Sequence, residues 1–220
     1  MILEATSLRC VPWLVHGFST RLGGDSLLDG ARVLNLGRTD WDSPQAVHAN
    51  RERFLAALGA REMELVTNRQ IHSDLARLVR ARPESACKGD ALLTKTRGLL
   101  LEAITADCVP ILLVDLKHRA VAAVHAGWRG TLRRIAEKTL GRMRAEFGTR
   151  PRDVRAALGP AIGRCCYEVG IEVVQKFHAQ FANAREWFDG PFDRLVSDDS
   201  PNPLQWLNMH PPGHQPPPPH

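Results

Sequence analysis

Short apolar runs separated by turn residues recur along the chain, and this pattern predicts β-strands. Two of the runs, residues 111–114 and 120–124, flank a polar turn, and His125 follows the second run directly. A glycine-containing turn comes next, and an amphipathic pattern begins at Thr131. A strand followed by such a turn and a helix is how α/β proteins place functional side chains at a strand end. We therefore expect the functional site in this stretch.

The same reading predicts the remaining elements. Further strands are expected at residues 11–18, 33–36, 64–67, 75–79, 90–94, 99–104 and 154–158. Apolar residues recur at helical spacing in three segments, which run from Ser43-Pro44 to Gly59, from Thr131 to Gly148, and over residues 171–181. Ser43 suits an N-cap and Pro44 the first helical position. The polar, glycine-rich segment 19–30 predicts a loop, and the whole pattern predicts an α/β fold.

Proline dominates the chain from Pro201 onward, in the sequence PNPLQWLNMHPPGHQPPPPH. Because proline cannot donate to a sheet ladder or continue a helix, residues 201–220 are predicted to form an extended or disordered tail. A chain of 220 residues is within the size range of one domain with a full core. We therefore expect a single domain over residues 1–200, followed by the tail.

Composition narrows the classes of protein to consider. The chain is 44% hydrophobic and 24% charged, which is ordinary for a globular protein. It has no apolar run of about 18 residues, as a membrane span needs, and we expect no signal peptide. Five cysteines, an odd number, fit reduced thiols, so we expect a cytoplasmic protein. The net charge of +5 is modest and the arginines are scattered, which does not favour nucleic-acid binding.

Cys108 and His125 are the candidate chemical groups of the central stretch. A thiol and an imidazole brought together outside a disulfide framework suggest a metal site or a Cys–His catalytic pair. His72 is the best third member because it lies in a polar cluster after a predicted strand, and His16 remains a candidate. The intervals from His72 to Cys108 and from Cys108 to His125, 36 and 17 residues, match no short zinc-finger signature. A buried thiol with two hydrogen-bonded histidines stays the alternative.

Seven sequence blocks follow one another in the order found in a known family. They are HGFSTRLGG, NLG, NRQIHSD, DALLT, TADCVPILLVD, AVAAVHAGWRGT and LGPAIGRCCYEVG. On these blocks, which cover about residues 11–181, the chain resembles the laccase-domain, YfiH-like family of purine nucleoside phosphorylases, once described as polyphenol oxidases. The ADC and HAGWRG blocks are highly specific.

The resemblance implies a fold and a metal site. The family fold is a four-layer α/β/β/α arrangement of mixed sheets. Members similar to this chain bind zinc through the histidine of the Gln-x-His block, the cysteine of ADC and the histidine of HAGWRG, which are His72, Cys108 and His125 here. Members usually continue with a further helix and strands, including a Cys-Thr element and a Tyr-Arg-Arg block. Neither follows Gly190, so we expect a shortened C-terminal part.

The resemblance also implies an activity, which is phosphorolysis of adenosine, inosine and methylthioadenosine to base and ribose 1-phosphate, with deamination of adenosine. Two imidazoles and one thiolate leave a fourth zinc position for water, whose pKa zinc can bring to about 7. Arg21 and Arg129 flank glycine-rich turns and are the candidates for holding phosphate. Asn35 is a weaker candidate for ribose or base, and Asp107 for orienting the site.

Other roles stay open. Cys108 as nucleophile and His125 as base would make a cysteine hydrolase or amidase, since the fold resembles that of deamidating toxins. A copper polyphenol oxidase is disfavoured, because the chain has no His-x-His pair and a multicopper cluster needs more histidines. A partner-binding protein with impaired catalysis is a further alternative. We expect nucleosides and phosphate as partners, no nucleic acid or membrane, and a monomer or homodimer, with zinc favoured over copper.

Overall fold

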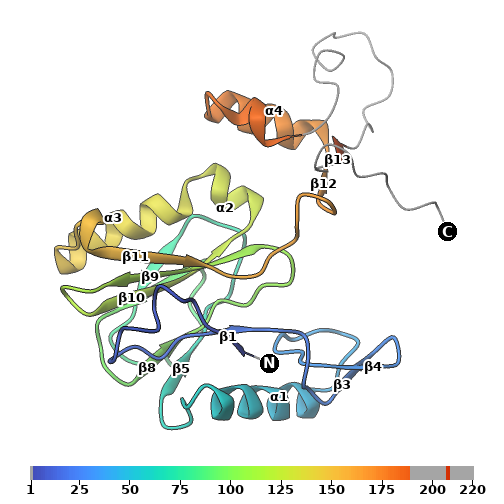
Figure 1. Ribbon diagram of the computed structural model, residues 1–220, viewed down its shortest axis with the longest axis vertical. Coiled ribbons are helices and arrows are strands. Elements are labelled where there is room, and N and C mark those ends of the chain that lie inside the picture. The colour runs from blue at the N-terminus through green and yellow to red at the C-terminus, as the bar shows by residue number, and fades with distance from the viewer. Residues whose placement is uncertain (1, 189–206, 209–220) are drawn as a thin grey trace. The chain divides into compact units, whose positions relative to one another are not determined.

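The computed structural model describes residues 2–188 and 207–208 of the chain (Figure 1). The chain divides into two compact units, Met1–Ala161 and Ile162–His220. The candidate chemical groups all belong to the first unit. The single domain that we expect over residues 1–200 stays a prediction.

A five-stranded sheet with the order β11-β9-β10-β7-β6 forms the centre of the first unit. Its strands are β6 (Ala76–Leu78), β7 (Ala91–Thr94), β9 (Val109–Asp115), β10 (Ala120–Ala126) and β11 (Val154–Leu158). The strands β6 and β7 are parallel and the other neighbours antiparallel, so the sheet is mixed. The hairpin β9–β10 pairs Pro110 with His125, which brings the start of β9 and the end of β10 to one edge.

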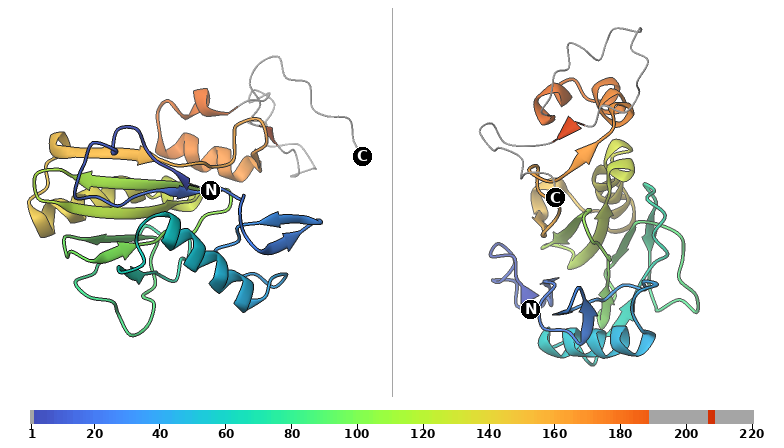
Figure 2. Two further views of the ribbon diagram at one scale, coloured as in Figure 1. Left: turned by 60° about the horizontal axis from the view of Figure 1, so that its bottom comes forward. Right: turned by 90° about the vertical axis from the view of Figure 1, so that its right-hand side faces the viewer.

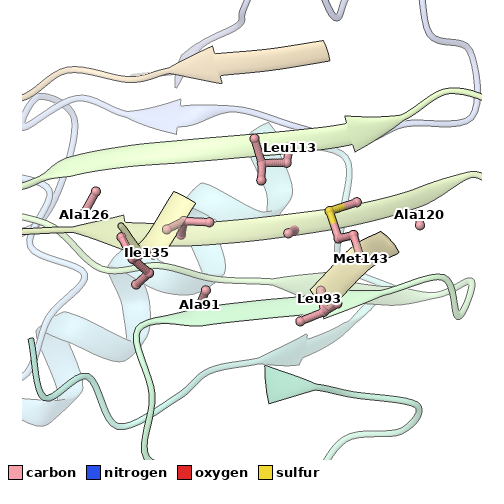
Figure 3. Close-up of a cluster of buried hydrophobic side chains, with 9 residues drawn as sticks. Ala91, Leu93, Leu113, Ala120, Ala126, Ile135 and Met143 are labelled. Atoms are coloured by element: carbon pink, nitrogen blue, oxygen red, sulfur yellow. The ribbon is translucent and has the colours of Figure 1, made fainter. Parts of the chain in front are cut away.

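Both faces of this sheet are buried, and alternation along β10 decides which residue meets which layer. Four residues of β10 face helix α3 (Ile135–Phe147), where Ile135 and Met143 pack on them; they are Ala120, Ala122, Val124 and Ala126 (Figure 3). On the opposite face, Val114 packs with Leu8 and Phe18 of the N-terminal segment. Period-two alternation of this kind is what a strand between two apolar layers requires.

Smaller elements complete the layers of the first unit. The strands β5 (Glu64–Val66) and β8 (Leu99–Leu101) form a parallel pair whose Val66 and Leu99 pack on Leu92 of β7. Helix α1 (Pro44–Ala57) covers the side of the unit away from α3 (Figures 1 and 2). The order α3, large sheet, β5–β8 and α1 agrees with the expected α/β/β/α arrangement. The mixed α/β fold with mixed sheets is confirmed.

The N-terminal segment differs from its prediction. The sequence predicts a strand at residues 11–18, but only Phe18 joins one, as β2 (Phe18–Ser19) paired with β1 (Ile2–Leu3). Local turns take up the preceding backbone instead, since the amide of Val11 donates to Leu8 and that of Leu14 to Val11. Apolar residues here are buried by turns and not by strand pairing.

The predicted loop 19–30 is also wrong, because it contains most of a hairpin formed by β3 (Ser26–Leu28) and β4 (Ala31–Val33). Asp29 and Gly30 connect the strands with φ values of 51° and 76°. Two consecutive positive φ values match the type I′ turn, which twists in the sense that a hairpin needs. The Asp-Gly pair was the available signal for this hairpin. The strand predicted at residues 33–36 is also displaced, because β4 ends at Val33. Asn35 lies in the turn that follows, where its side chain accepts the Gly37 amide.

The helix predictions hold for the start of α1 and the end of α3, but the second predicted helix begins three residues earlier and is interrupted. Ser43 caps α1 through a hydrogen bond from the Ala46 amide to its hydroxyl, as expected. The helix expected from Thr131 to Gly148 is instead two helices, α2 (Trp128–Leu132) and α3. Arg134 separates them with a left-handed φ of 62°, which turns the chain so that both helices follow the sheet. Gly148 ends α3 at a φ of 74°, and the short 3-10 helix η1 (Pro151–Asp153) leads to β11.

The second unit contains helix α4 (Ile171–Gln180), the 3-10 helix η2 (Ala184–Trp187) and a two-stranded sheet. The sheet pairs β12 (Glu168–Val169) with β13 (Leu207–Asn208). Phe177 is the centre of an aromatic group with Phe181, Trp187 and Phe188. Residues 201–206 and 209–220 of the expected tail lie outside the described residues, so its disorder stays a prediction. No helix in the described part of the chain has the length and apolar character needed to cross a membrane.

Asp115, at the end of β9 remote from His125, is fully buried and caps the turn before β10. It accepts hydrogen bonds of 2.9 Å from the amides of Lys117 and His118, and its other oxygen lies 2.8 Å from Nδ1 of His118. Burial alone would raise the pKa of Asp115, but the hydrogen bonds that it accepts lower it. A lowered folded-state pKa contributes stability above the unfolded pKa, and this contribution is lost as the pH falls through the folded pKa.

We therefore predict that Asp115→Asn unfolds more easily than the wild type at pH 7, by about 1–3 kcal/mol. The difference should shrink as the pH falls below the usual carboxyl range, because the wild-type side chain then becomes protonated. Urea unfolding of both proteins between pH 7 and pH 3 measures this. A difference that stays constant with pH would contradict the assignment.

Candidate metal centre

Three elements bring His72, Cys108 and His125 together. Cys108 directly precedes β9, and His125 is the second-last residue of β10, so the antiparallel pairing sets them at the same edge. His72 arrives from the loop before β6. One ligand atom from each residue, a histidine nitrogen or the cysteine sulfur, lies within 4.8 Å of the other two. The imidazole rings of His72 and His125 meet edge to face with centroids 4.9 Å apart. The convergence predicted from the sequence is present.

Asp90 is the buried group behind the two histidines. One of its oxygens lies 2.9 Å from Nδ1 of His125 and accepts the His72 amide at 3.0 Å. The other accepts the Ser73 amide at 2.7 Å and the Ser73 hydroxyl at 2.6 Å. The Ile71 amide lies 3.2 Å from both oxygens. Asp90 is 1% exposed, so this carboxylate is solvated by the site's own donors and not by water.

Side-chain amides fix the rest of the His72 loop. Gln70 donates to the carbonyl of Ile104 at 2.7 Å and accepts its amide at 2.8 Å, as a neighbouring strand would do. Asn68 donates to the carbonyl of Gly89 at 2.6 Å, one residue before Asp90. The loop is thus fastened on both sides of the site, and it holds His72 at a φ of 54°. A non-glycine residue is uncommon in this left-handed region and persists where the surroundings determine it.

The surroundings of the site shift the pKa values of Cys108 and Asp90 in opposite directions. Burial raises the pKa of Cys108, and the negative charges of Asp107 and Asp90 raise it further. Burial by itself would also raise the pKa of Asp90, but hydrogen bonds from Ser73 and His125 lower it below its ordinary value. The site therefore combines a fixed negative charge with a protonated thiol. A divalent cation among the three ligands would reverse the preference of the thiol, since coordination stabilises thiolate.

The site fits a metal ion in both donor chemistry and space. Two imidazoles and one thiolate are the three-ligand set of catalytic zinc sites. Zinc–ligand lengths of ~2.0–2.3 Å in tetrahedral geometry place ligand atoms roughly 3.6 Å apart, which is a small contraction from the present separation. Gly127 lines the same space: a Cβ there would lie 3.0 Å from the sulfur of Cys108 and 3.1 Å from Cδ2 of His72. The glycine leaves room that an ion and its ligands would occupy.

The remaining predicted residues lie differently. Arg129 is exposed within α2, with its guanidinium carbon 4.5 Å from the centroid of the Trp128 ring. Arg21 is exposed, and its carbonyl accepts the Leu34 amide. The side chain of Asn35 is engaged in its own loop, where it donates to Thr39 and Asp42 and accepts the Gly37 amide. Among the described contacts, none joins Arg21 or Asn35 to the metal candidates. Asp107 is exposed, and its negative charge raises the pKa of Cys108.

The prediction from sequence missed Asp90 and Ser73 as parts of the site. The sequence places Asp90 only as the first residue of a predicted apolar strand, DALLT. An acid at the start of a strand that is buried on both faces needs donors nearby, and this was the available signal. Which donors they are depends on the parallel pairing of β6 with β7, which is a contact between distant segments.

A family model described as "Multi-copper polyphenol oxidoreductase laccase" matches residues 15–197. The chain belongs to this family. "Purine nucleoside phosphorylase" of Deinococcus radiodurans is 41% identical over 172 residues, 78% of this chain and 65% of that protein. "Purine nucleoside phosphorylase YfiH" of Shigella flexneri is 37% identical over 180 residues, 82% of this chain and 72% of that protein.

A solved structure agrees with the family assignment. The crystal structure of the Bacillus licheniformis hypothetical protein YfiH is similar with a TM-score of 0.74 and 29% identity, over 88% of this chain and 72% of that one. The chain thus spans about two thirds of the Deinococcus protein and somewhat more of the other two. The YfiH-like family that the sequence blocks predicted is confirmed.

We predict that Gly127→Ala weakens metal binding without unfolding the protein. The backbone at Gly127, with φ −75° and ψ 168°, suits any residue, so the effect of the added methyl group is steric. That group would press on Cys108 and His72 and oppose their contraction around an ion. We expect at least a tenfold rise in the zinc dissociation constant, measured by competition with a chromophoric chelator.

Gly141→Ala is the matched control, because a Cβ at Gly141 in α3 meets nothing within 4 Å. This change should leave zinc affinity unchanged and raise helix stability by up to about 1 kcal/mol. Equal zinc affinities for Gly127→Ala and the wild type would show that the space beside Gly127 is not used by the ion.

Proposed function

We propose that this chain is a zinc-dependent purine nucleoside phosphorylase that cleaves adenosine, inosine and methylthioadenosine to base and ribose 1-phosphate, and that it also deaminates adenosine. The observation that carries the proposal is the convergence of His72, Cys108 and His125 at one sheet edge in a family whose relatives are named purine nucleoside phosphorylases. The open zinc position that this ligand set provides when the ion is bound supplies Lewis acidity and acidified water.

The residues of the chain supply positioning. The contact between Nδ1 of His125 and Asp90 leaves Nε2 of that imidazole as its ligand atom. Cys108 is half-buried and His125 is buried, so these two ligand candidates lie below the surface while His72 is exposed. A substrate approaching from the His72 side would therefore meet the three ligands with part of the surrounding water excluded. Exclusion of water strengthens electrostatic interactions with a reacting group.

Arg129 is the proposed phosphate contact. It follows His125 by four residues, and its guanidinium lies over the Trp128 ring. Within residues 2–188 no hydrogen bond engages its N–H donors, which are arranged for two-pronged contact with an oxyanion. The ring contact restricts the side chain and so lowers the entropy lost on binding phosphate. Arg21 is the second proposed contact, and Asn35 is left as a structural residue of its loop.

A cysteine hydrolase is the second candidate, because the Cys108 thiol lies within 4.8 Å of the His125 imidazole. The raised pKa of Cys108 does not favour this role, since a nucleophilic cysteine normally has a lowered one. Copper is the second candidate ion, since thiolate and imidazole suit both metals.

Metal analysis and product analysis on the full chain test the proposal together. We predict about one zinc per chain after purification, and its loss from His72→Ala, Cys108→Ser and His125→Ala. His48→Ala is the control, since His48 is exposed on α1. Adenosine and inosine should yield ribose 1-phosphate only when phosphate is present, and chelation should abolish the reaction. Free ribose without phosphate would overturn phosphorolysis, and full activity after chelation would favour the cysteine hydrolase.

For Arg129 we predict a weaker phosphate interaction in Arg129→Ala. The loss of one charge-assisted contact costs ~1.5–3 kcal/mol, which is roughly a ten- to hundredfold rise in the phosphate concentration for half-maximal rate. Arg129→Lys keeps the charge without the fork and should restore only part of the effect. Arg144→Ala, an exposed arginine of α3, removes the same charge and should leave phosphate dependence unchanged. Unchanged phosphate dependence in a folded, metal-loaded Arg129→Ala would show that Arg129 has only a packing role on Trp128.

A further inference from the structure

One buried carboxylate reaches both histidine ligands by different routes. It contacts the His125 side chain directly, at Nδ1, and it reaches His72 only through the backbone, by accepting the amides of residues 71 to 73. These two parts of the chain lie 53 residues apart, from position 72 to position 125. Asp90 is therefore a common hydrogen-bond partner of two ligand candidates that are distant in the sequence.

The contact with His125 determines which nitrogen faces the other ligands. A carboxylate accepts and does not donate, so a neutral imidazole beside it carries its proton on Nδ1. Nε2 then presents its lone pair, which is the form of histidine that coordinates a metal. The opposite tautomer would place a proton where the ion must bind. Asp90 thus selects the competent form of His125.

The contacts with the His72 loop stabilise a backbone that is otherwise unfavourable. His72 has a φ of 54°, in the left-handed region, and such a residue costs roughly 1–3 kcal/mol unless its surroundings determine it. Three consecutive amides, from Ile71 to Ser73, donate to the same carboxylate, and the Ser73 hydroxyl adds a fourth donor. A ring of donors around one anion is a geometry that an extended loop could not provide.

We propose that Asp90 is a positioning residue that assembles the metal centre before the ion arrives, by fixing the tautomer of His125 and the backbone of His72 at once. This inference rests on the metal centre of the proposed function. It predicts that both histidines are already in place in the metal-free protein, and that the affinity for the ion depends on a residue that never touches it.

The variant Asp90→Asn tests this with little change in size. An amide has one acceptor and one donor end, whereas both oxygens of Asp90 now accept. In either orientation the new NH2 group faces donors, which are either Ser73 or the pair His72 and His125. We expect zinc affinity to fall about 10- to 100-fold, as for loss of a partner behind a metal ligand. Competition with a chelator at pH 8 measures the change.

The chain contains its own control in Asp115. It is also fully buried, it also lies against Nδ1 of a histidine, and it also accepts two backbone amides, but it stands at the other end of the β9–β10 hairpin. The two ends of the seven-residue strand β9 lie roughly 20 Å apart. Asp115→Asn should therefore reduce stability without changing zinc affinity. Equal losses of zinc affinity in both variants would reduce Asp90 to a general stabiliser and overturn the proposal.

A second measurement needs no variant and no metal. Nitrogen-15 NMR of the imidazoles in the wild-type apo protein reports the tautomer, and hydrogen exchange reports the amides of residues 71 to 73. We expect the His125 proton on Nδ1 and slow exchange at those amides. A proton on Nε2, or exchange as fast as in an open loop, would overturn the proposal even if Asp90→Asn does not fold. If the apo protein meets both expectations but wild type binds no zinc, the proposed function fails while the positioning by Asp90 stands.

Discussion

The pairing of β9 with β10 is the constraint on which the candidate site depends. This register sets Pro110 opposite His125, and Cys108 lies just outside the first strand at the same edge. Even-numbered residues of β10 face α3, while His125 is on the other face with Val121. Because side chains alternate with a period of two, a slip of one residue would turn His125 into the apolar layer under α3. Burial of alanine and valine on the α3 side therefore also fixes the orientation of a ligand.

The two ends of this hairpin carry the same chemical pair in different settings. Asp115 and His118 are three residues apart and close a turn, so their contact follows from local sequence. Asp90 directly precedes β7 and His125 lies in β10, and these two strands are neighbours in the sheet. The first pair stabilises a turn, whereas the second orients His125, beside which His72 and Cys108 also lie. A buried aspartate–histidine contact therefore does not by itself indicate a functional site. Whether further ligand candidates lie next to the histidine distinguishes the two cases.

The three ligand candidates could be predicted from the sequence because each lies beside a segment whose apolar or polar pattern is recognisable from neighbouring residues alone. Cys108 and His125 border two apolar strands, and the family blocks added His72 with greater certainty than its polar surroundings could. The carboxylate behind them was missed, because its donors come from a loop that only tertiary packing brings close. The N-terminal turns near Val11 and the break at Arg134 were missed for a similar reason, since local apolar spacing did not distinguish them from a strand and a continuous helix. The hairpin turn at Asp29-Gly30 was also missed, but it could have been predicted, because an Asp-Gly pair between two short strands favours such a turn.

X-ray absorption at the zinc edge tests the central claim, that His72, Cys108 and His125 hold one ion. The zinc-loaded wild type should show a single sulfur neighbour at ~2.3 Å and nitrogen or oxygen neighbours at ~2.0–2.1 Å. The sulfur signal should disappear in Cys108→Ser that has been reloaded with zinc. A spectrum with no sulfur, with several sulfurs, or with an unchanged sulfur signal in Cys108→Ser would place the ion elsewhere and contradict the account.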